Sequence, residues 1–426
     1  MLNRTDPVKI ALSVALLAIV FTLALDSDFY SSSMVDAFMA MALAGAVVTL
    51  LVVETSWSNL ACVAVGGLAL AAIDYQVMRF QPRLMAALSF AGLSALAVMG
   101  MRAIWAPARG RELDSGGERQ ADRTLLLYAF LPSVLFVASE YMASTLLDYT
   151  EALHPKTFDL YLYSFDCSLH VQFCFLAGQF FSRFLWIRFA GLVFYIALPL
   201  PLALVYAAHL RSRNKSAFAV MLAFLVTGPL GVLFYNMVPA TGPVHIFGPG
   251  FPWRPLSTLQ AMHLVLAPIR VPGARNAIPS LHMAWVLLVW WNSRGLAAWI
   301  RGIAAAFVLF TVLATLGTGE HYFVDLVVAF PFALMVGALC FYPLPLSNGA
   351  RRAAFLFGTF ASLGWMALLS FATPFFWISA LIPWAMVVTT ISVSIWLMHR
   401  LQNAESTHEA LPQENAVEER SLVTTW

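Results

Sequence analysis

The chain has 426 residues, of which 61% are hydrophobic and 11% are charged, and its formal net charge is +2. Soluble domains carry about 45–50% apolar and about 25% charged residues, so this composition excludes a soluble globular protein and a disordered one. The balanced charge excludes a basic nucleic-acid-binding face, and four cysteines exclude a disulfide scaffold. We therefore expect an all-α polytopic membrane protein, a bundle of transmembrane helices.

Long apolar runs, bounded by charged or turn residues, predict about twelve transmembrane helices. The first run follows Arg4 and Lys9, as a signal peptide would, but it is long and no clear small-residue cleavage site follows it. We therefore favour a retained helix there. Strands are not expected, because the runs do not alternate. The predicted spans are 8–26, 34–53, 58–77, 84–106, 124–147, 183–208, 217–238, 280–293 (short for a span), 296–316, 322–343, 353–373 and 376–399.

Lysine and arginine residues in the connecting segments set the predicted orientation, because cytoplasmic loops are enriched in them. The linker at 107–123 and the short loops on the same side are basic, whereas Arg79 and Arg83 are exceptions. With twelve spans, both termini are expected in the cytoplasm. The two longest loops, 148–182 and 239–279, then lie outside.

One motif reads Pro279-Ser280-Leu281-His282 at the start of an apolar run. A proline in the first turn and a hydroxyl at the cap are typical of a helix start. Free backbone N–H groups and the helix dipole at such an end favour an anion, phosphate above all. Arg275, a few residues upstream, has the planar donor group that binds phosphate oxygens.

A second motif places His321 and Asp325 four residues apart. On a helix the two side chains share one face and can approach each other. A carboxylate on one imidazole nitrogen fixes the tautomer and leaves a lone pair on the other. An imidazole nucleophile needs that arrangement.

The predicted topology brings the two motifs together. His282 and His321 each begin a span on the outer side, separated by one helical hairpin. Two histidines and an aspartate could instead ligate zinc. The phosphate-type helix start and Arg275 favour an anion over a metal, so no metal or other cofactor is expected.

These residues resemble the phosphatidic acid phosphatase type 2 superfamily, and most closely its branch of inositol phosphorylceramide synthases and bacterial relatives. The family's second motif, Pro-Ser-x-His, is similar to residues 279–282, and its third motif ends in His-x-x-x-Asp, like 321–325. The resemblance implies that His321 is the nucleophile that becomes phosphorylated and that Asp325 orients it. It also implies that His282 protonates the leaving group.

Some family positions differ in this chain. Residues 314–315 are Ala-Thr where phosphatases usually have Ser-Arg, and Phe247 stands where the first motif has lysine. Such losses are similar to what the sphingolipid-type phosphotransferases show. Arg275, Ser280 and Arg254 remain as candidate phosphate-binding residues.

The resemblance implies a six-helix catalytic core. We expect the core at 124–343, four N-terminal transmembrane helices at 1–106, a cytoplasmic linker at 107–123, two C-terminal transmembrane helices at 344–399 and a disordered acidic tail at 400–426. We expect an integral membrane protein of a bacterial inner membrane, with its site facing the periplasm or lumen.

The resemblance favours a phosphotransferase or phosphatase acting on a lipid-linked phosphate, with headgroup transfer ahead of hydrolysis of phosphatidic acid or a polyprenyl diphosphate. The expected partners are the membrane, a lipid phosphate and an acceptor alcohol on a lipid or sugar; nucleic acid is not expected, and the oligomeric state stays open. A twelve-span transporter or flippase is the alternative of another class, and a catalytically inactive scaffold is a third. A transporter would place ionisable residues near mid-membrane and often has related halves, whereas here most lie at span ends.

Two features of the outer loop 148–182 stay open. Asp166 could contact an acceptor headgroup. Cys167 and Cys174 lie on the oxidising side, where either a disulfide or two free thiols are compatible with the sequence.

Overall fold

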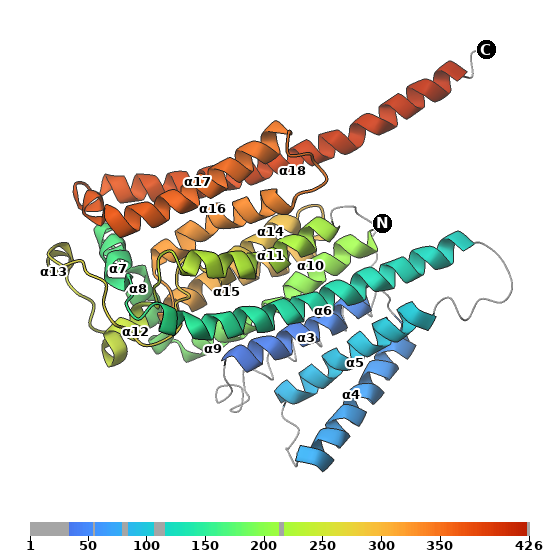
Figure 1. Ribbon diagram of the computed structural model, residues 1–426, viewed down its shortest axis with the longest axis horizontal. Helices are drawn as coiled ribbons and strands as arrows, with labels where there is room; N and C mark the ends of the chain where they lie inside the picture. The colour runs from blue at the N-terminus through green and yellow to red at the C-terminus, as the bar shows by residue number, and fades with distance from the viewer. Residues whose placement is uncertain (1–33, 54–55, 79–83, 106–115, 213–216, 424–426) are drawn as a thin grey trace.

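The computed structural model describes residues 34–53, 56–78, 84–105, 116–212 and 217–423. The predicted span at 8–26 lies outside these residues. Within them the chain is helical and forms no strand, as expected; Thr157 and Ile269 make one isolated antiparallel bridge. The long helices lie alongside one another in a bundle, and the short helices α7, α8, α12 and α13 gather at one end of it (Figure 1).

The described helices have the following bounds. In chain order they are α3 (Met34–Val53), α4 (Trp57–Met78), α5 (Leu84–Trp105), α6 (Gly116–Leu153), α7 (Asp159–Ser168), α8 (Phe173–Arg183), α9 (Leu185–Ile196), α10 (Pro199–Arg211), α11 (Ala217–Tyr235), α12 (Pro243–Phe247), the 3₁₀ turn η1 (Gly248–Gly250), α13 (Thr258–Met262), α14 (Leu281–Asn292), α15 (Ala298–Thr318), α16 (Phe323–Cys340), α17 (Gly349–Phe371), the 3₁₀ turn η2 (Thr373–Trp377) and α18 (Leu381–Val423).

Eight of the described helices are long and apolar enough to cross a membrane. They are α4, α5, α6, α11, α15, α16, α17 and α18, and the bent pair of α9 and α10 makes up to nine. The expectation of a polytopic helical membrane protein is therefore confirmed. The count of twelve stays a prediction, because α14 and the apolar stretch Ala37–Val53 of α3 are shorter than a full span.

The predicted single span at 183–208 is broken in the structure. It forms α9 and α10, whose axes differ by 49°. Pro199 occupies the first turn of α10, and Pro201 follows it. Neither proline has an N–H to continue the ladder of α9, so the chain bends where the sequence alone suggested one continuous apolar helix.

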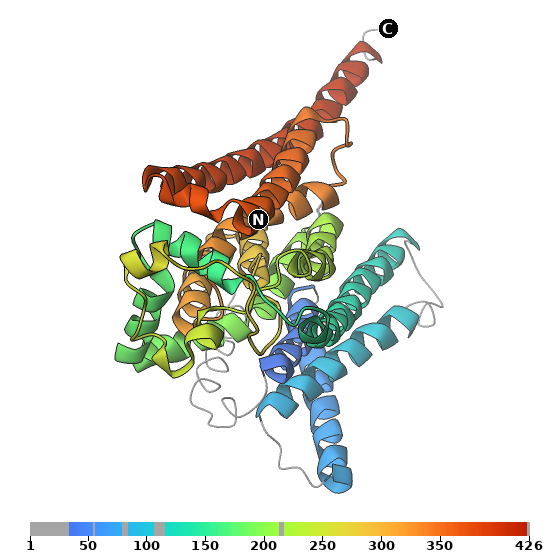
Figure 2. The same ribbon diagram turned by 60° about the vertical axis from the view of Figure 1, so that its left-hand side comes forward.

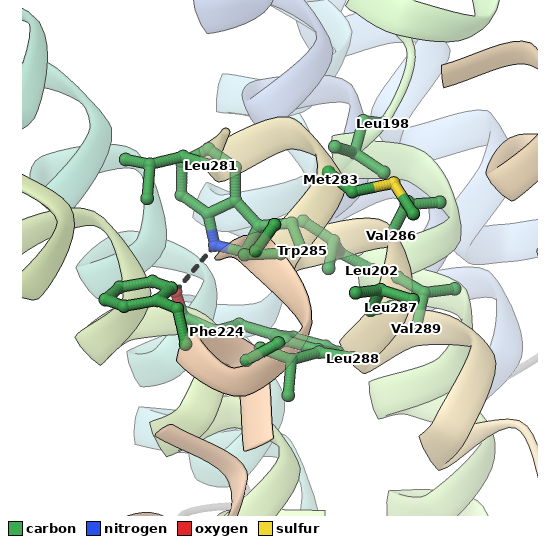
Figure 3. Close-up of a cluster of buried hydrophobic side chains, with 14 of the residues drawn as sticks. Leu198, Leu202, Phe224, Leu281, Met283, Trp285, Val286, Leu287, Leu288 and Val289 are labelled. Atoms are coloured by element: carbon green, nitrogen blue, oxygen red, sulfur yellow. Dashed lines mark hydrogen bonds between the residues drawn. The ribbon is translucent and has the colours of Figure 1, made fainter. Parts of the chain in front are cut away.

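Helix α14 is short and enclosed by other helices. Its twelve residues extend about 18 Å, against about 30 Å for the hydrocarbon core. The neighbouring α15 has 21 residues and a length of about 31 Å. Ser280 and Leu281, at the start of α14, are buried. Apolar side chains surround α14, and the Trp285 indole donates to the carbonyl of Phe224 at 3.0 Å (Figure 3).

A buried arginine completes the end of α16. Arg351 of α17 is 7% exposed, and its guanidinium donates to the carbonyls of Ala338, Leu339 and Leu344. The last carbonyls of a helix have no partner within the helix, and hydrocarbon offers none. Arg351 therefore stabilises both the end of α16 and the turn into α17.

We expect Arg351→Met to lower the thermal unfolding midpoint in detergent by several degrees. The substitution keeps most of the side-chain volume and leaves three carbonyls without a donor, each such loss costing about 1–3 kcal/mol. Arg352→Met is the matched control, because the neighbouring Arg352 is exposed. Equal melting temperatures for the two variants would contradict this role.

The C-terminal end differs from the sequence-based expectation. Helix α18 continues to Val423, through the stretch from 400 that we expected to be disordered, and projects beyond the bundle (Figure 1). The tail is rich in glutamate, glutamine and alanine, which favour helix wherever the chain is solvated. In the second view, α16–α18 (orange to red) lie at the top, apart from α3–α6 (blue to teal) at the lower right (Figure 2). The division into domains stays a prediction.

Candidate active site

Carboxylates bind the free backbone N–H groups at the start of α16. The first N–H groups of a helix have no partner within it. Tyr322 N–H donates to Asp325 Oδ2 at 2.7 Å, and Phe323 N–H donates to Asp166 Oδ2 at 2.7 Å. Val324 N–H donates to Asp166 Oδ1 at 3.1 Å. The three residues that follow the candidate nucleophile in the chain are therefore held by two buried carboxylates.

A third carboxylate joins this helix start to a loop. Asp159 is fully buried and accepts hydrogen bonds from the backbone N–H groups of Thr241 and Gly242, at 3.0 and 2.9 Å. It also accepts one from the Tyr322 hydroxyl at 3.0 Å. Asp159 therefore fixes the loop at 240–242 against the residue next to His321.

His321 has its two ring nitrogens in different surroundings. Nδ1 is 2.8 Å from the carbonyl oxygen of Ala277 and 3.5 Å from Asp325 Oδ2. Both neighbours are acceptors, so we assign the proton to Nδ1 and the lone pair to Nε2. Nε2 lies 3.3 Å from Ser280 Oγ, which also accepts from Met283 N–H at 3.4 Å. The serine hydroxyl is therefore oriented to donate to the imidazole lone pair.

The structure brings the two predicted helix starts side by side. Ser280 N–H donates to the carbonyl of Asp325 at 3.2 Å. Ala277 N–H donates to the carbonyl of Ala240 at 3.1 Å, so the segment before α14 is fixed to the loop that Asp159 holds. Ser280 also caps α14, as the sequence predicted.

His282 packs among aromatic rings. Its centroid is 3.7 Å from that of Tyr195, with 16° between the planes, and 5.5 Å from that of Phe38. Its Nε2 is buried and has no hydrogen-bond partner among the described residues. Tyr195 belongs to α9 and Phe38 to α3, so rings from two different helices fix the imidazole, and its Nε2 is left without a partner among the described residues.

Arg275 lies close in the chain but is engaged elsewhere. It is 1% exposed, and its guanidinium donates to the carbonyls of His154, at 2.9 Å, and Gly273. These bonds fix the loop at 270–276 to the end of α6. Arg254 is exposed on the loop after η1. A phosphate-binding role for either arginine stays a prediction.

A cavity of about 500 Å³ lies beside this cluster. Its walls come from α3, α8, α9, α12, the end of α15 and the loop at 251–253. Glu320, the residue before His321, is part of the wall. Arg188 of α9 is also part of it, and the sequence motifs did not point to that residue.

Glu320 is paired with a histidine. Its Oε2 is 3.4 Å from His245 Nε2, and the two side chains are 31% and 32% exposed. The hydrogen bond to Glu320 raises the pKa of His245 above 6.5, against a smaller opposing effect of burial. A raised folded-state pKa gives stability that is complete below the unfolded pKa and is lost as the pH rises through the folded one.

We expect the thermal midpoint of the protein to fall as the pH rises from about 6.5 through the raised pKa of His245. In His245→Gln this part of the decline should be absent, because glutamine does not titrate. Melting curves of both proteins between pH 6 and 9 measure it. Thermal midpoints that change with pH in parallel for the two proteins would show that the His245–Glu320 pair contributes nothing to the pH dependence of stability.

Two residues of the site escaped the sequence motifs or received another role. Asp159 was not singled out, and Asp166 was considered for an acceptor headgroup, whereas it binds two N–H groups of α16. Burial raises the pKa of Asp166, although these N–H groups oppose the change. Asp159 and Asp166 are seven residues apart, which is about two helical turns. This spacing within an aromatic segment could have indicated that both aspartates lie on one face of a helix. Cys167 and Cys174 are buried free thiols.

We expect Asp166→Asn to reduce both stability and turnover. Asparagine keeps one acceptor oxygen, so one N–H of the first turn of α16 loses its partner, at about 1–3 kcal/mol. Thermal melts and initial rates measure the effect. Asp148→Asn, at an exposed position on α6, is the control. An Asp166→Asn enzyme as stable and active as Asp148→Asn would contradict the assignment.

Comparison with known protein families gives a match over part of the chain. Residues 160–339 match the model of the PAP2 superfamily, whose members are generally phosphatases and phosphotransferases. The matched segment holds Asp166, Ser280, His282, His321 and Asp325. No curated protein and no solved structure matches the chain. The match and the apolar helices fit a membrane-embedded phosphatase or phosphotransferase with a lipid phosphate substrate.

Proposed function

We propose that the chain is an integral-membrane phosphotransferase or phosphatase that acts on a lipid-linked phosphate through a phosphohistidine on His321. The observation that carries this proposal is the imidazole between Ala277 and Ser280. Two acceptors lie at Nδ1, and the serine hydroxyl lies 3.3 Å from Nε2. A fixed tautomer with its lone pair on the reacting nitrogen is what nucleophilic catalysis by imidazole requires.

In the first step, Nε2 of His321 attacks the phosphorus of the lipid phosphate. The bond between phosphorus and the leaving oxygen breaks with its electron pair on oxygen, and His282 in its imidazolium form protonates that oxygen. His282 Nε2 has no partner in the described part of the chain. The negative charge of an incoming phosphate favours the imidazolium form of a histidine beside it.

In the second step, an acceptor hydroxyl attacks the phosphohistidine. The neutral His282 accepts the hydroxyl proton, the P–N bond breaks and the imidazole of His321 is regenerated. Asp325, 3.5 Å from Nδ1, stabilises the positive charge that the ring carries while it is phosphorylated. Water as the acceptor gives hydrolysis, and an alcohol gives headgroup transfer.

We favour headgroup transfer of the inositol phosphorylceramide synthase type over phosphatidic acid or polyprenyl diphosphate hydrolysis. The basic residues of the phosphatase motifs are missing at 247 and 315, which supports the transferase. The proposed site faces the periplasm or lumen, with both termini in the cytoplasm. The basic residues at the opposite ends of the spans support that orientation.

The test is turnover in liposomes with metal ions chelated. Phosphatidic acid, a polyprenyl diphosphate or phosphatidylinositol is supplied with and without a ceramide or diacylglycerol acceptor, and both free phosphate and new lipid are measured. We expect His321→Ala to abolish turnover and His282→Ala to lower it by about 10²–10⁴. Asp325→Asn should lower it as well, because asparagine cannot stabilise the charged ring.

His263→Ala is the control, since this loop histidine is exposed and should leave turnover unchanged. New lipid that depends on the acceptor supports a transferase, and free phosphate without acceptor supports a phosphatase. Turnover that survives in His321→Ala would overturn the proposal.

A further inference from the structure

The motif arginines do not line the cavity beside the histidines. Arg275 donates to two loop carbonyls and is buried, and Arg254 is exposed outside the cavity wall. A phosphate that enters the site needs a positive group, because its charge must be balanced when water is displaced. Among the described residues of the wall, Arg188 is the one basic side chain.

Arg188 stands out on its own helix. The sequence of α9 is LWIRFAGLVFYI, in which Arg188 is the one charged residue. Arg188 lies in the first turn of this apolar helix, and its side chain is exposed. Its guanidinium makes no hydrogen bond or ion pair to any residue that the structure describes. Its donors are therefore free for a ligand.

Three separate segments lead directly from the cavity wall to the histidines. Glu320 is in the wall and precedes His321. Ile196 is in the wall, and the preceding Tyr195 stacks on His282. On α3, Ala37 is in the wall and the next residue packs its ring on His282. Consecutive Cα atoms are about 3.8 Å apart, so the cavity adjoins the catalytic cluster.

We propose that Arg188 binds the phosphate group of the substrate in this cavity. The inference rests on the proposed function and adds a residue that the sequence motifs do not include. A guanidinium presents paired N–H donors that match two phosphate oxygens. Arg188 thereby takes the part of the motif lysine and arginine that this chain lacks.

The other charge of the wall makes Arg188 necessary. Glu320 faces the same cavity, and the end of α15 at Gly317 and Thr318 presents the negative end of a helix dipole. His245 pairs with Glu320, but Arg188 is the one basic side chain among the described residues of the wall. Phosphate affinity should therefore depend strongly on this one side chain.

The test compares Arg188→Gln and Arg188→Lys with Arg183→Gln. Arg183 is exposed in the last turn of α8, outside the cavity wall, and serves as the matched control. One readout is KM and kcat for lipid turnover. The second is the rise of the melting temperature with added inorganic phosphate, which needs no turnover.

We expect Arg188→Gln to raise KM by about 10- to 100-fold, with a smaller change in kcat, and to abolish stabilisation by phosphate. Arg188→Lys should restore part of both effects, and Arg183→Gln should behave as wild type. An Arg188→Gln protein that phosphate still stabilises would overturn the inference. So would a wild-type protein that phosphate does not stabilise.

If Arg188 only anchors α9 at the membrane surface, we expect a different result. Arg188→Gln would then melt earlier but keep its phosphate effect and its KM, and the inference would be wrong. Turnover unaffected by both His321→Ala and Arg188→Gln would overturn the proposed function and the inference together. Turnover lost in His321→Ala but unaffected by Arg188→Gln would overturn the inference alone.

Discussion

The start of α16 is the constraint on which the rest of the site depends. A helix that begins inside a membrane bundle exposes N–H groups that lipid cannot satisfy. Asp166 and Asp325 bind three consecutive N–H groups there, and Asp159 binds the Tyr322 hydroxyl. The backbone next to His321 is thereby fixed, and the position of its ring follows from it.

Helices outside the matched segment also stabilise the start of α16, because they contact the helix that carries its carboxylates. Asp159 and Asp166 both belong to that helix, α7. The Trp377 indole donates to Ser164 Oγ at 2.9 Å, and the Trp384 indole donates to the carbonyl of Leu169 at 3.1 Å. From the N-terminal part of the chain, Phe38 of α3 packs its ring against His282. Segments before and after residues 160–339 therefore determine the geometry of the candidate catalytic residues.

The sequence predicted the parts of the site that depend on local spacing. Capping predicted the helix start at Ser280, and the structure has it. His321 and Asp325 were expected on one helix face; His321 instead lies just before α16, and its Nδ1 is 3.5 Å from Asp325 Oδ2. The motif also favoured Asp325 as the partner of one ring nitrogen, whereas the Ala277 carbonyl lies closer to Nδ1 than Asp325 does. A backbone carbonyl from a distant loop leaves no signal in residue identity.

The features of the site and the fold that the sequence did not predict depend on tertiary contacts, which residue spacing does not encode. An arginine beside a phosphate motif suggests an anion ligand, but Arg275 reaches loop carbonyls because the chain folds back onto α6. The hydropathy pattern predicted one continuous span at 183–208, and it did not indicate the bend before Pro199. The role of α3 next to His282 could not be predicted, since no charged pair marks that helix.

The most direct measurement is the detection of the phosphoenzyme. Wild-type protein and His321→Ala are mixed with lipid phosphate under single-turnover conditions without acceptor, quenched in base and analysed by peptide mass spectrometry. We predict one phosphoryl group on the imidazole of His321, stable in base, labile in acid and absent from the variant. A phosphoryl group on another residue, or turnover with no phosphorylated enzyme at any time, would contradict it.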